Sequence, residues 1–395
     1  MKVLLVHNRY QHSGGEDTVF AAEAELLTRA GHEVIQYVRQ NDEIADARWL
    51  GRVRLAASTL WARDSYRAVR DLVQREHPDV AHFHNTFPLV SPAAYYACHK
   101  AGVPVVQTLH NYRLLCPAAT FVRNGKPCEL CIRRRVPWPG VLYRCYRESR
   151  AASAAVAAML TFHHWRRTWT DQVDSYIALT EFSRRKFLEG SLPADRVVVK
   201  PNFVHPDPGG RLGAGSYALF VGRLSAEKGL ATLAQAWKRL TDPIPLVVAG
   251  DGPERARLEA AVRGVGAVRF LGRLSREDVM AALHKATFVV FPTECYENFP
   301  LTVAEAFACG VPVIASRLGA TAEIVVDGRT GLSFTPGDPD DLAAKVTWAW
   351  TRPDEMGAMG HAARAEYKAK YTPERNYRML MEIYAGAAAH TRSSR

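Results

Sequence analysis

Apolar residues follow two alternating patterns along this chain. Some form short continuous runs rich in valine and isoleucine, and others recur every three or four positions among polar residues. The first pattern is typical of buried strands and the second of amphipathic helices. The strands predicted in the first half are Val3–His7, Glu33–Val38, Val80–His84, Val103–Leu109, Tyr176–Leu179 and Val197–Val199. Those predicted in the second half are Tyr217–Val221, Leu246–Ala249, Val268–Leu271, Phe288–Phe291 and Pro312–Ala315.

Helical stretches separate these strands. Two of them, Glu16–Ala30 and Pro92–Ala101, each end directly before a glycine, the residue that best tolerates the left-handed conformation after a helix. The alanine-rich stretch Ala151–Ala158 is a third. The helices predicted in the second half are Gly229–Leu240, Glu254–Arg263, Arg276–Lys285 and Leu301–Cys309. This alternation predicts an α/β protein with doubly wound parallel sheets.

A stretch rich in proline and glycine, Lys200–Gly210, interrupts the series and is interpreted as a linker. We therefore expect a Rossmann-like domain over residues 1–200, a linker over 201–210 and a second Rossmann-like domain over 211–373. Residues 374–395 would form a C-terminal helix and tail that pack back on the first domain. In open α/β sheets ligands bind outside the carboxyl ends of the strands, so two such domains would meet at a ligand-binding cleft.

Length and apolar content agree with two cores. The chain has 395 residues, of which 48% are hydrophobic, more than one typical domain accommodates. Its opening residues resemble a strand and not a targeting segment, and the longest nearly apolar run, Ala151–Phe162, is shorter than the ~20 residues that span a bilayer. We expect a cytoplasmic protein, or one attached peripherally to the inner face of the membrane.

The net charge of +11 is concentrated in one region. Residues 48–150 carry 17 basic and 6 acidic side chains, with arginine clusters at 48/52/54, 63/67/70 and 133/134/135. Such a region attracts polyanions, among them an anionic membrane surface or lipid phosphate, although a merely solvated basic face remains an alternative. Basic and aromatic residues do not alternate as in a nucleic-acid recognition module, so no nucleic acid is expected. The aromatic residues that accompany the charge are Trp49, Trp61, Tyr66, Trp138, Tyr143, Trp165 and Trp169.

The segment from Phe291 to Ser316 is the most informative for chemistry. A predicted strand runs through a tight loop into a helix that begins near Pro300 and ends at Gly310. Unbonded amides and the helix dipole make such a helix start suitable for a pyrophosphate. Glu297 precedes the helix and Glu305 lies eight positions later, so two carboxylates are available for hydroxyl-rich groups.

A second motif follows the first strand of the second domain. In Val221-Gly222-Arg223-Leu224-Ser225-Ala226-Glu227-Lys228-Gly229, an arginine and a lysine stand five positions apart across a turn. Both side chains would reach the same anion, Arg223 through its planar fork and Lys228 as a point charge.

Together, the two glutamates before an Ala-Cys-Gly-x-Pro-Val run and the Gly-Arg-x4-Lys-Gly element resemble the retaining family 4 glycosyltransferases of GT-B fold. The resemblance implies that Glu297 lies beside the donor sugar, that Glu305 accepts hydrogen bonds from the ribose, and that Arg223 and Lys228 neutralise the donor diphosphate. The donor would be a UDP- or GDP-sugar, with no further cofactor. No metal is expected, and the two cations would take its place.

Further positions follow from the same resemblance. The family's Glu-Gly-Phe-Gly is Glu297-Asn298-Phe299-Pro300 here, and since proline has no N–H, the amides of Phe299, Leu301 and Thr302 would remain for the donor. Arg273 would contact the nucleotide. In the first domain, Ser13-Gly14-Gly15-Glu16 matches a loop that meets donor phosphates and acceptor, although a paired glycine is also an ordinary turn.

His110, at the end of a predicted strand, matches the family's active-site histidine, which hydrogen-bonds the donor sugar. His82 and His84 stand at the end of a neighbouring strand. They would either line the acceptor side or serve the structure only.

Four of the seven cysteines, Cys116, Cys128, Cys131 and Cys145, fall in one segment with a single Cys-x2-Cys pair. They would form either a structural zinc site or a set of reduced thiols in an inserted loop. Cys98, Cys295 and Cys309 are interpreted as small buried residues.

The function expected by resemblance is transfer of a sugar, with retention, to a glycan, a lipid-linked or another acceptor in cell-surface polysaccharide or glycoconjugate synthesis. Another GT-B enzyme, such as a sugar-nucleotide epimerase or phosphorylase, is the alternative within the fold. A non-catalytic polyanion-binding protein is the alternative outside it.

Overall fold

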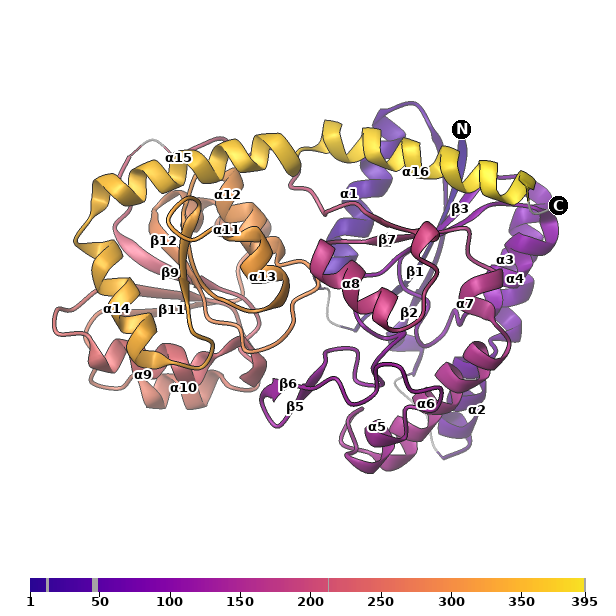
Figure 1. The fold of residues 1–395 in the computed structure, drawn as a ribbon, viewed down its shortest axis with the longest axis horizontal. Helices are drawn as coiled ribbons and strands as arrows, with labels where there is room; N and C mark the ends of the chain where they lie inside the picture. The colour runs from indigo at the N-terminus through magenta and orange to yellow at the C-terminus, as the bar shows by residue number, and fades with distance from the viewer. Residues whose placement is uncertain (12–13, 45–48, 212, 394–395) are drawn as a thin grey trace. The chain divides into compact units, whose positions relative to one another are not determined.

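A computed structural model describes residues 1–11, 14–44, 49–211 and 213–393 (Figure 1). The chain divides into two compact units. The first contains Met1–Phe121, Glu129–Pro201 and Asn376–Arg395, and the second contains Val122–Cys128 and Asn202–Arg375. The last helix therefore belongs to the same unit as the N-terminus.

The first unit is built on a six-stranded parallel sheet in the order β2-β1-β3-β4-β7-β8. Its strands are β1 (Lys2–Arg9), β2 (Glu33–Gln40), β3 (Val80–Phe83), β4 (Val105–Thr108), β7 (Ser175–Ala178) and β8 (Val197–Val199). The strand that follows β1 in the sequence, β2, lies on one side of β1, and the next strand, β3, lies on its other side. The sheet thus has its topological switch point between β1 and β3, which is where ligands bind in such folds.

Helices connect the strands of this unit and close it at the C-terminus. They are α1 (Gly15–Arg29), α2 (Trp49–Leu60), α3 (Arg63–Glu76), α4 (Ala93–Ala101), α5 (Trp138–Leu142), α6 (Arg150–Trp165), α7 (Thr168–Asp171), α8 (Glu181–Glu189) and α16 (Pro373–Ser393). Short 3-10 turns lie at η1 (Asn41–Ile44) and η2 (Ala194–Arg196).

The second unit repeats the plan with a parallel sheet in the order β11-β10-β9-β12-β13-β14. Its strands are β9 (Tyr217–Val221), β10 (Leu246–Ala249), β11 (Val268–Gly272), β12 (Ala286–Phe291), β13 (Val313–Ser316) and β14 (Gly331–Phe334). Here the switch point lies between β9 and β12. A two-stranded ribbon, β5 (Val122–Arg123) with β6 (Lys126–Pro127), is antiparallel.

The helices of the second unit surround this sheet. They are α9 (Leu230–Arg239), α10 (Arg255–Ala261), α11 (Arg276–His284), α12 (Leu301–Ala308), α13 (Gly319–Ile324), α14 (Pro339–Trp350) and α15 (Pro353–Lys370), with a 3-10 turn η3 (Ala226–Lys228).

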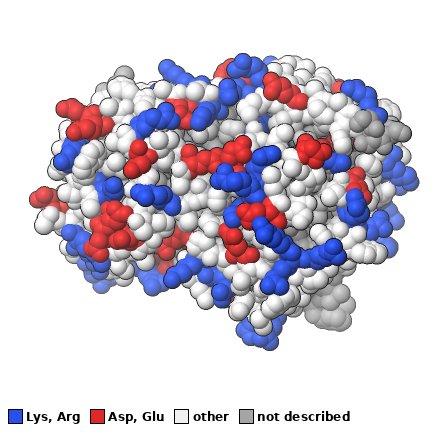
Figure 2. All heavy atoms as spheres, in the orientation of Figure 1, with Lys and Arg blue, Asp and Glu red and all other residues white. Residues whose placement is uncertain are grey.

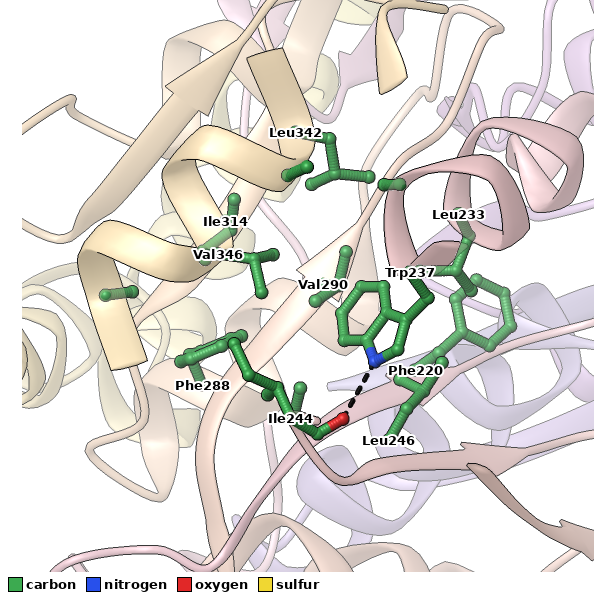
Figure 3. Close-up of a cluster of buried hydrophobic side chains, with 14 of the residues drawn as sticks. Phe220, Leu233, Trp237, Ile244, Leu246, Phe288, Val290, Ile314, Leu342 and Val346 are labelled. Atoms are coloured by element: carbon green, nitrogen blue, oxygen red, sulfur yellow. Dashed lines mark hydrogen bonds between the residues drawn. The ribbon is translucent and has the colours of Figure 1, made fainter. Parts of the chain in front are cut away.

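A large apolar core stabilises one face of the second sheet (Figure 3). Side chains from β9, β10, β12 and β13 meet those of α9 and α14, with Trp237 among them. The indole is 2% exposed, and its Nε1 donates to the Ile244 carbonyl oxygen at 3.0 Å. Because this hydrogen bond satisfies the indole's only donor, the ring contributes its full apolar surface at no polar cost.

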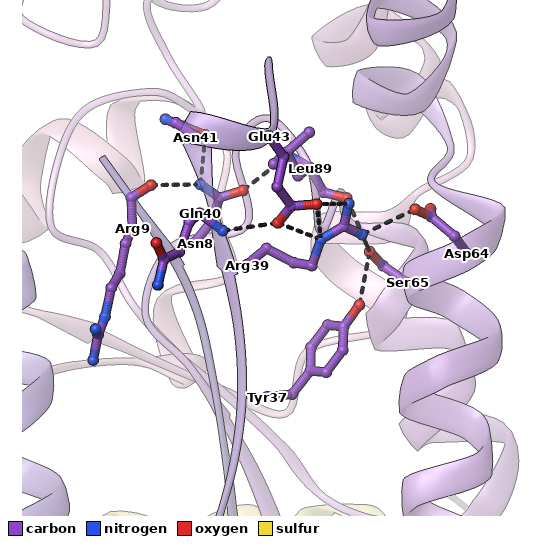
Figure 4. A network of polar contacts seen from close by, with 10 residues as sticks. All are labelled: Asn8, Arg9, Tyr37, Arg39, Gln40, Asn41, Glu43, Asp64, Ser65 and Leu89. Atoms are coloured by element: carbon purple, nitrogen blue, oxygen red, sulfur yellow. Dashed lines mark hydrogen bonds and ion pairs between the residues drawn. The ribbon is translucent and has the colours of Figure 1, made fainter. Parts of the chain in front are cut away.

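A polar network holds β2 to α3 in the first unit (Figure 4). Arg39 donates to both oxygens of Glu43 at 2.6 to 3.0 Å and to Asp64 at 2.9 Å. It also donates to the Ser65 hydroxyl at 3.1 Å, and Tyr37 donates to the same hydroxyl. The hydrogen bond to Glu43 raises the pKa of Arg39 further above its usual value, so a permanently charged fork fixes this corner of the sheet.

The structure confirms the predicted fold class. Each predicted strand is present with ends that differ by at most two residues, and the helices expected from Glu16, Pro92 and Ala151 are α1, α4 and α6. The strand β14 and the ribbon β5–β6 were not predicted. Among the described residues, no helix is both long and apolar enough to span a bilayer.

Candidate active site

Two loops meet at the switch point of the second sheet, one after β9 and one after β12. The backbone N–H of Glu294 donates to the Glu227 carbonyl oxygen at 2.8 Å, and the Thr293 hydroxyl donates to the same oxygen at 3.3 Å. The carboxyl ends of β9 and β12 are adjacent because the strands pair directly. The two predicted motifs, far apart in the sequence, therefore lie side by side.

Lys228 and Glu297 form an ion pair across these loops. Lys228 Nζ lies 2.6 Å from Glu297 Oε1, and the Thr293 hydroxyl donates to the same oxygen at 3.0 Å. Burial lowers the pKa of Lys228, but the charge of Glu297, with further help from its hydrogen bond, outweighs that effect and keeps the pKa above its usual value. Lys228 thus stays protonated where solvent is restricted.

Gly229 allows the lysine to come this close. Its φ is +69°, a left-handed conformation, and an added Cβ would collide with the carbonyl oxygen of Pro292. Only glycine fits both conditions, so the turn after Lys228 can press against the loop after β12.

The helix α12 starts at the same place. The Val303 N–H donates to the Pro300 carbonyl oxygen at 2.9 Å, so the amides of Leu301 and Thr302 occupy the first turn, before the intrahelical bonds begin. Phe299 is buried and packs on Tyr371, with ring centroids 5.7 Å apart. Asn298 is buried as well. The loop is therefore anchored by Phe299, and the predicted amides lie at the positive end of the helix dipole.

Glu305 lies one turn further along α12 and is partly buried. Burial raises the pKa of its carboxyl group to about 7, against a smaller opposing effect of Arg276. Arg276, in the first turn of α11, was not singled out from the sequence. Its only signal there was a basic residue directly after a serine that caps a helix, and Ser275 does accept from the Asp278 N–H.

Two other predicted cations occupy different positions. Arg223 follows Gly222 at the end of β9, beside the Lys228 loop, and is exposed. Arg273 is also exposed but follows β11, an edge strand separated from β9 by β10. Arg223 thus shares the switch point with Lys228, whereas Arg273 lies two strands away.

The first unit has its own polar cluster at the switch point between β1 and β3. Glu16, in the first turn of α1, accepts from Asn85 Nδ2 at 2.9 Å and from Asn111 Nδ2 at 3.3 Å. Burial and the charge of Asp17 raise the pKa of Glu16 to about 7, against the hydrogen bonds from Tyr10 and Asn111. Loops after β1, β3 and β4 therefore converge on one carboxyl group.

The glycine loop leads into this cluster. Gly14 caps α1 in an extended conformation, and a Cβ added at Gly14 or Gly15 would meet no atom within 4 Å. The two glycines therefore leave open space above the start of α1, in keeping with close approach of a ligand. Ser13, which belongs to the same predicted motif, lies outside the described residues.

His110 lies beside His84, with His84 Nδ1 2.9 Å from His110 Nε2. Burial, followed by the influence of His84, lowers the pKa of His110 well below its usual value. His82 is fully buried and contacts the Thr108 and Tyr384 hydroxyls at 2.7 and 2.8 Å. Lining the acceptor side was therefore the wrong alternative for His82, because its ring nitrogens face groups of the core.

The cysteines divide as follows. Cys98, Cys295 and Cys309 are buried, as expected. Cys116 is buried too, and Cys128, Cys131 and Cys145 are partly exposed. Within the described ranges, the one group of three or more potential metal ligands within 4.8 Å of one another is Glu23, His82 and His84, so it includes none of the cysteines. Zinc was only one of the two alternatives for the four clustered cysteines, and no group in the described ranges supports it.

The aromatic residues of the basic region fall into two sets. Trp169 is 7% exposed, and Trp61 packs against Tyr66, Tyr96, Phe162 and His163. Trp138, Tyr143 and Trp165 are 50, 46 and 76% exposed. The described part of the chain does not include Arg48 or the side chains of Trp49 and Arg52. On the face shown in Figure 2, basic and acidic side chains are mixed.

The chain matches models of known families over nearly its whole length. The model described as glycosyl transferases group 1 matches residues 210–366, and that of glycosyltransferase family 4 matches residues 13–208. The junction between the matches falls where the second unit begins, near Asn202.

Individual proteins show the same similarity. The chain is 36% identical over 160 residues to the D-rhamnosyltransferase WbpZ of Pseudomonas aeruginosa, a match that covers 40% of this chain and only 42% of that protein. It is 24% identical over 394 residues to the uncharacterized glycosyltransferase MJ1178 of Methanocaldococcus jannaschii, covering 97% of this chain and 98% of that one. The crystal structure of Anabaena HepE in complex with UDP superposes with a TM-score of 0.70 at 18% identity, covering 98% and 100% of the two chains. This likeness confirms the GT-B fold.

Proposed function

Because the chain belongs to the group 1 glycosyltransferases of family 4, we propose that it transfers a sugar from a nucleoside-diphosphate sugar to an acceptor, with retention of anomeric configuration. The donor is a UDP- or GDP-sugar, and the reaction requires no other cofactor. HepE, which has the same fold, was crystallised with UDP and with UDP-glucose.

One observation carries the proposal: the Lys228–Glu297 pair at the switch point of the second sheet, beside the start of α12. A leaving diphosphate develops negative charge as the glycosidic bond breaks. Lys228 supplies a fixed cation for that charge, with the first-turn amides of α12 and Arg223 as further donors. Preorganised groups of this kind need no rearrangement during the reaction, which is why they commonly dominate catalysis.

Glu297 has two roles in this scheme. Its carboxylate balances the charge of Lys228, which keeps the ammonium group in place. When a diphosphate binds, the three N–H groups of Lys228 are shared between phosphate and carboxylate, and Glu297 lies beside the donor sugar. Glu305, deeper on α12, accepts hydrogen bonds from the ribose hydroxyls, and His110 hydrogen-bonds the donor sugar.

The test measures release of nucleoside diphosphate from a panel of UDP- and GDP-sugars, with and without glycan and lipid-linked acceptors. Lys228→Ala should weaken diphosphate binding by roughly 10- to 150-fold, because it removes a charge-assisted hydrogen bond worth ~1.5–3 kcal/mol. Lys238→Ala is the matched control, since Lys238 is an exposed lysine on the neighbouring α9. Equal binding of mono- and diphosphate by the parent protein would contradict the assignment.

Retention is tested on the product. Proton NMR of the freshly formed glycoside reports the anomeric coupling, which should match that of the donor. A product of opposite anomeric configuration would refute the retaining assignment while leaving transfer itself intact.

The acceptor, we propose, is a glycan or lipid-linked molecule reached at an anionic membrane surface, in cell-surface polysaccharide or glycoconjugate synthesis. The support lies in residues 129–148, which we call the α5 segment. Leu130, Val136, Trp138, Leu142 and Tyr143 are 42 to 50% exposed there. The exposed arginines among them are Arg133, Arg134, Arg135, Arg144 and Arg147. Apolar side chains interspersed with arginines suit an interface that is apolar below and anionic above.

Vesicle co-sedimentation tests this. Each arginine near an anionic surface contributes about 1 kcal/mol, so binding should appear with anionic vesicles at low salt and fade as salt rises. Trp138→Ala should reduce binding, whereas Trp348→Ala, on α14 of the second unit, should not. Equal sedimentation with neutral and anionic vesicles would refute the membrane proposal and leave a soluble acceptor.

A further inference from the structure

A buried row of polar side chains runs from the first unit's core to His110. Glu23, on α1, is 1% exposed, and its Oε1 lies 3.3 Å from His84 Nε2. The other nitrogen of His84, Nδ1, lies 2.9 Å from His110 Nε2. The two rings are nearly parallel, 21° apart, with centroids separated by 5.1 Å. Glu23, His84 and His110 thus form a continuous series of contacts.

The carboxyl group at the start of the series is ionised. Lys200 Nζ lies 2.9 Å from Glu23 Oε2 and 3.0 Å from Asn376 Oδ1 on α16. Burial by itself raises the pKa of Glu23, but Lys200 and then His82 outweigh it and hold the pKa well below its usual value. A carboxylate at this position can only accept hydrogen bonds.

The charge of Glu23 decides where His84 carries its proton. Burial, followed by the influence of His82, lowers the pKa of His84 to about 3, so the ring is neutral at pH 7 and has one proton. Nε2 lies 3.3 Å from the negative Glu23 oxygen, an ion-pair distance without the alignment of a hydrogen bond, so electrostatic attraction keeps the proton on Nε2. Nδ1 of His84 is then an acceptor.

The same logic applies one ring further. His84 Nδ1 can accept a proton only if His110 Nε2 donates one, because two lone pairs at 2.9 Å would repel. The pKa of His110 is also held well below its usual value, so this ring too has one proton at pH 7. With that proton on Nε2, His110 Nδ1 has a lone pair.

We infer that Glu23 and His84 are positioning residues that fix the tautomer of His110, so that His110 Nδ1 acts as a hydrogen-bond acceptor for a sugar hydroxyl. This deepens the proposed function and rests on it for the role of His110 toward the donor. A sugar hydroxyl that donates to Nδ1 is recognised, whereas a group that can only accept, such as a carbonyl or carboxylate oxygen, is rejected at that point.

Glu23, His82 and His84 also have the composition of a metal site, with ligand atoms within 4.8 Å of one another. The ammonium group of Lys200 occupies one side of the carboxylate at 2.9 Å and already neutralises it. The Tyr384 hydroxyl, 2.8 Å from His82 Nδ1, contacts the nitrogen that would have to bind the metal. The ion pair with Lys200 and the hydroxyl contacts of His82 therefore already engage much of this cluster, and the series of contacts from Glu23 to His110 needs no ion.

The tautomer can be measured directly. In protein labelled with 15N at histidine, long-range 15N–1H spectra at pH 7 distinguish Nδ1–H from Nε2–H rings, and a His110→Gln variant assigns the signals of that residue. We expect the Nε2–H form for both His84 and His110. A proton on Nδ1 of His110 in the parent protein overturns the inference.

Two matched variants distinguish control of the His110 tautomer by His84 from a general disturbance of the core. His84→Phe removes the acceptor and should give a mixture of His110 tautomers, with the signals assigned by comparison with the double variant His84→Phe/His110→Gln. Its kcat should fall about tenfold, the loss expected for one hydrogen bond of ordinary strength. His82→Phe alters an equally buried ring, whose Nδ1 contacts Glu23 at 3.0 Å and the Tyr384 hydroxyl at 2.8 Å and whose Nε2 contacts the Thr108 hydroxyl at 2.7 Å. It should leave the His110 tautomer unchanged.

A shift of the His110 tautomer in His82→Phe as large as in His84→Phe would overturn the inference, because the effect would then be purely structural. The spectra need no substrate. Absence of transfer with every donor would therefore refute the proposed function. The measured tautomer would still show whether Glu23 and His84 fix the proton of His110.

Discussion

Replacing Glu305 by glutamine should stabilise the protein at pH 8 and much less at pH 5, while it impairs sugar transfer. The carboxyl group has a pKa of about 7 in the folded protein, against 4.5 for an ordinary glutamate. The folded state therefore keeps its proton to higher pH than the unfolded state does. Stability from this group is fully present below pH 4.5 and is lost as pH rises through 7.

The size of the effect follows from the shift. Each pKa unit corresponds to about 1.4 kcal/mol, so the ionised group costs the folded state up to about 3 kcal/mol at pH 8 and less than about 1 kcal/mol at pH 5. Since Glu305 is only partly buried, solvent reduces the upper figure, and a gain of roughly 1–3 kcal/mol at pH 8 is expected. Glutamine keeps the shape but does not ionise.

Urea denaturation of the parent and Glu305→Gln at pH 5 and pH 8 measures this difference. Glu355→Gln, an exposed glutamate in the first turn of α15, is the control and should follow the parent at both pH values. Transfer should fall in Glu305→Gln even though the protein is more stable, the usual relation at a functional site. The reasoning is refuted if Glu305→Gln changes the unfolding free energy equally at the two pH values.

Three further outcomes are expected. Lys228→Ala and Glu297→Gln should each lower transfer strongly, and a double-mutant cycle on unfolding free energy should give a coupling of about 1 kcal/mol or more; strict additivity would show that the pair is not energetically linked. Trp237→Ala should cost about 3–5 kcal/mol in urea denaturation, because it empties a filled core, and a loss below about 1 kcal/mol would contradict that packing. Lys200→Met should cost about 3–5 kcal/mol by leaving the Glu23 carboxylate buried without its cation, and adding Glu23→Gln should recover part of that loss, a recovery that calorimetry can detect.

The sequence predicted the strands well because each is a short buried run with clear ends. Val3–Val6 and Leu246–Ala249 are apolar throughout, which only a strand buried on both faces requires. The strand β14 escaped prediction because Gly331-Leu332-Ser333-Phe334 has only two apolar residues and opens with a glycine. Its place is set by its pairing with β13, a tertiary contact that has no local pattern.

The site was predictable where its residues belong to sequence motifs and not where they come from separate elements. Lys228 and Glu297 stood out by spacing, and the structure joins them at 2.6 Å. Glu23 did not stand out, because a glutamate within an amphipathic helix is ordinarily a solvated residue. Only the fold brings Lys200, from the end of β8, and Asn376, from α16, to within 3.0 Å of each other. The spacing of residues along the sequence does not indicate a contact of this kind.

The position of α16 has a consequence for the order of events during synthesis. The first unit takes its last segment, Asn376–Arg395, from chain that follows the whole of the second unit. A ribosome therefore releases all residues needed by the sheet of the second unit before it delivers Asn376 and Tyr384 to their buried partners Lys200 and His82. Until then the Glu23–Lys200 pair is incompletely covered. We expect the second unit to complete its folding first on the nascent chain, although its residues are translated later.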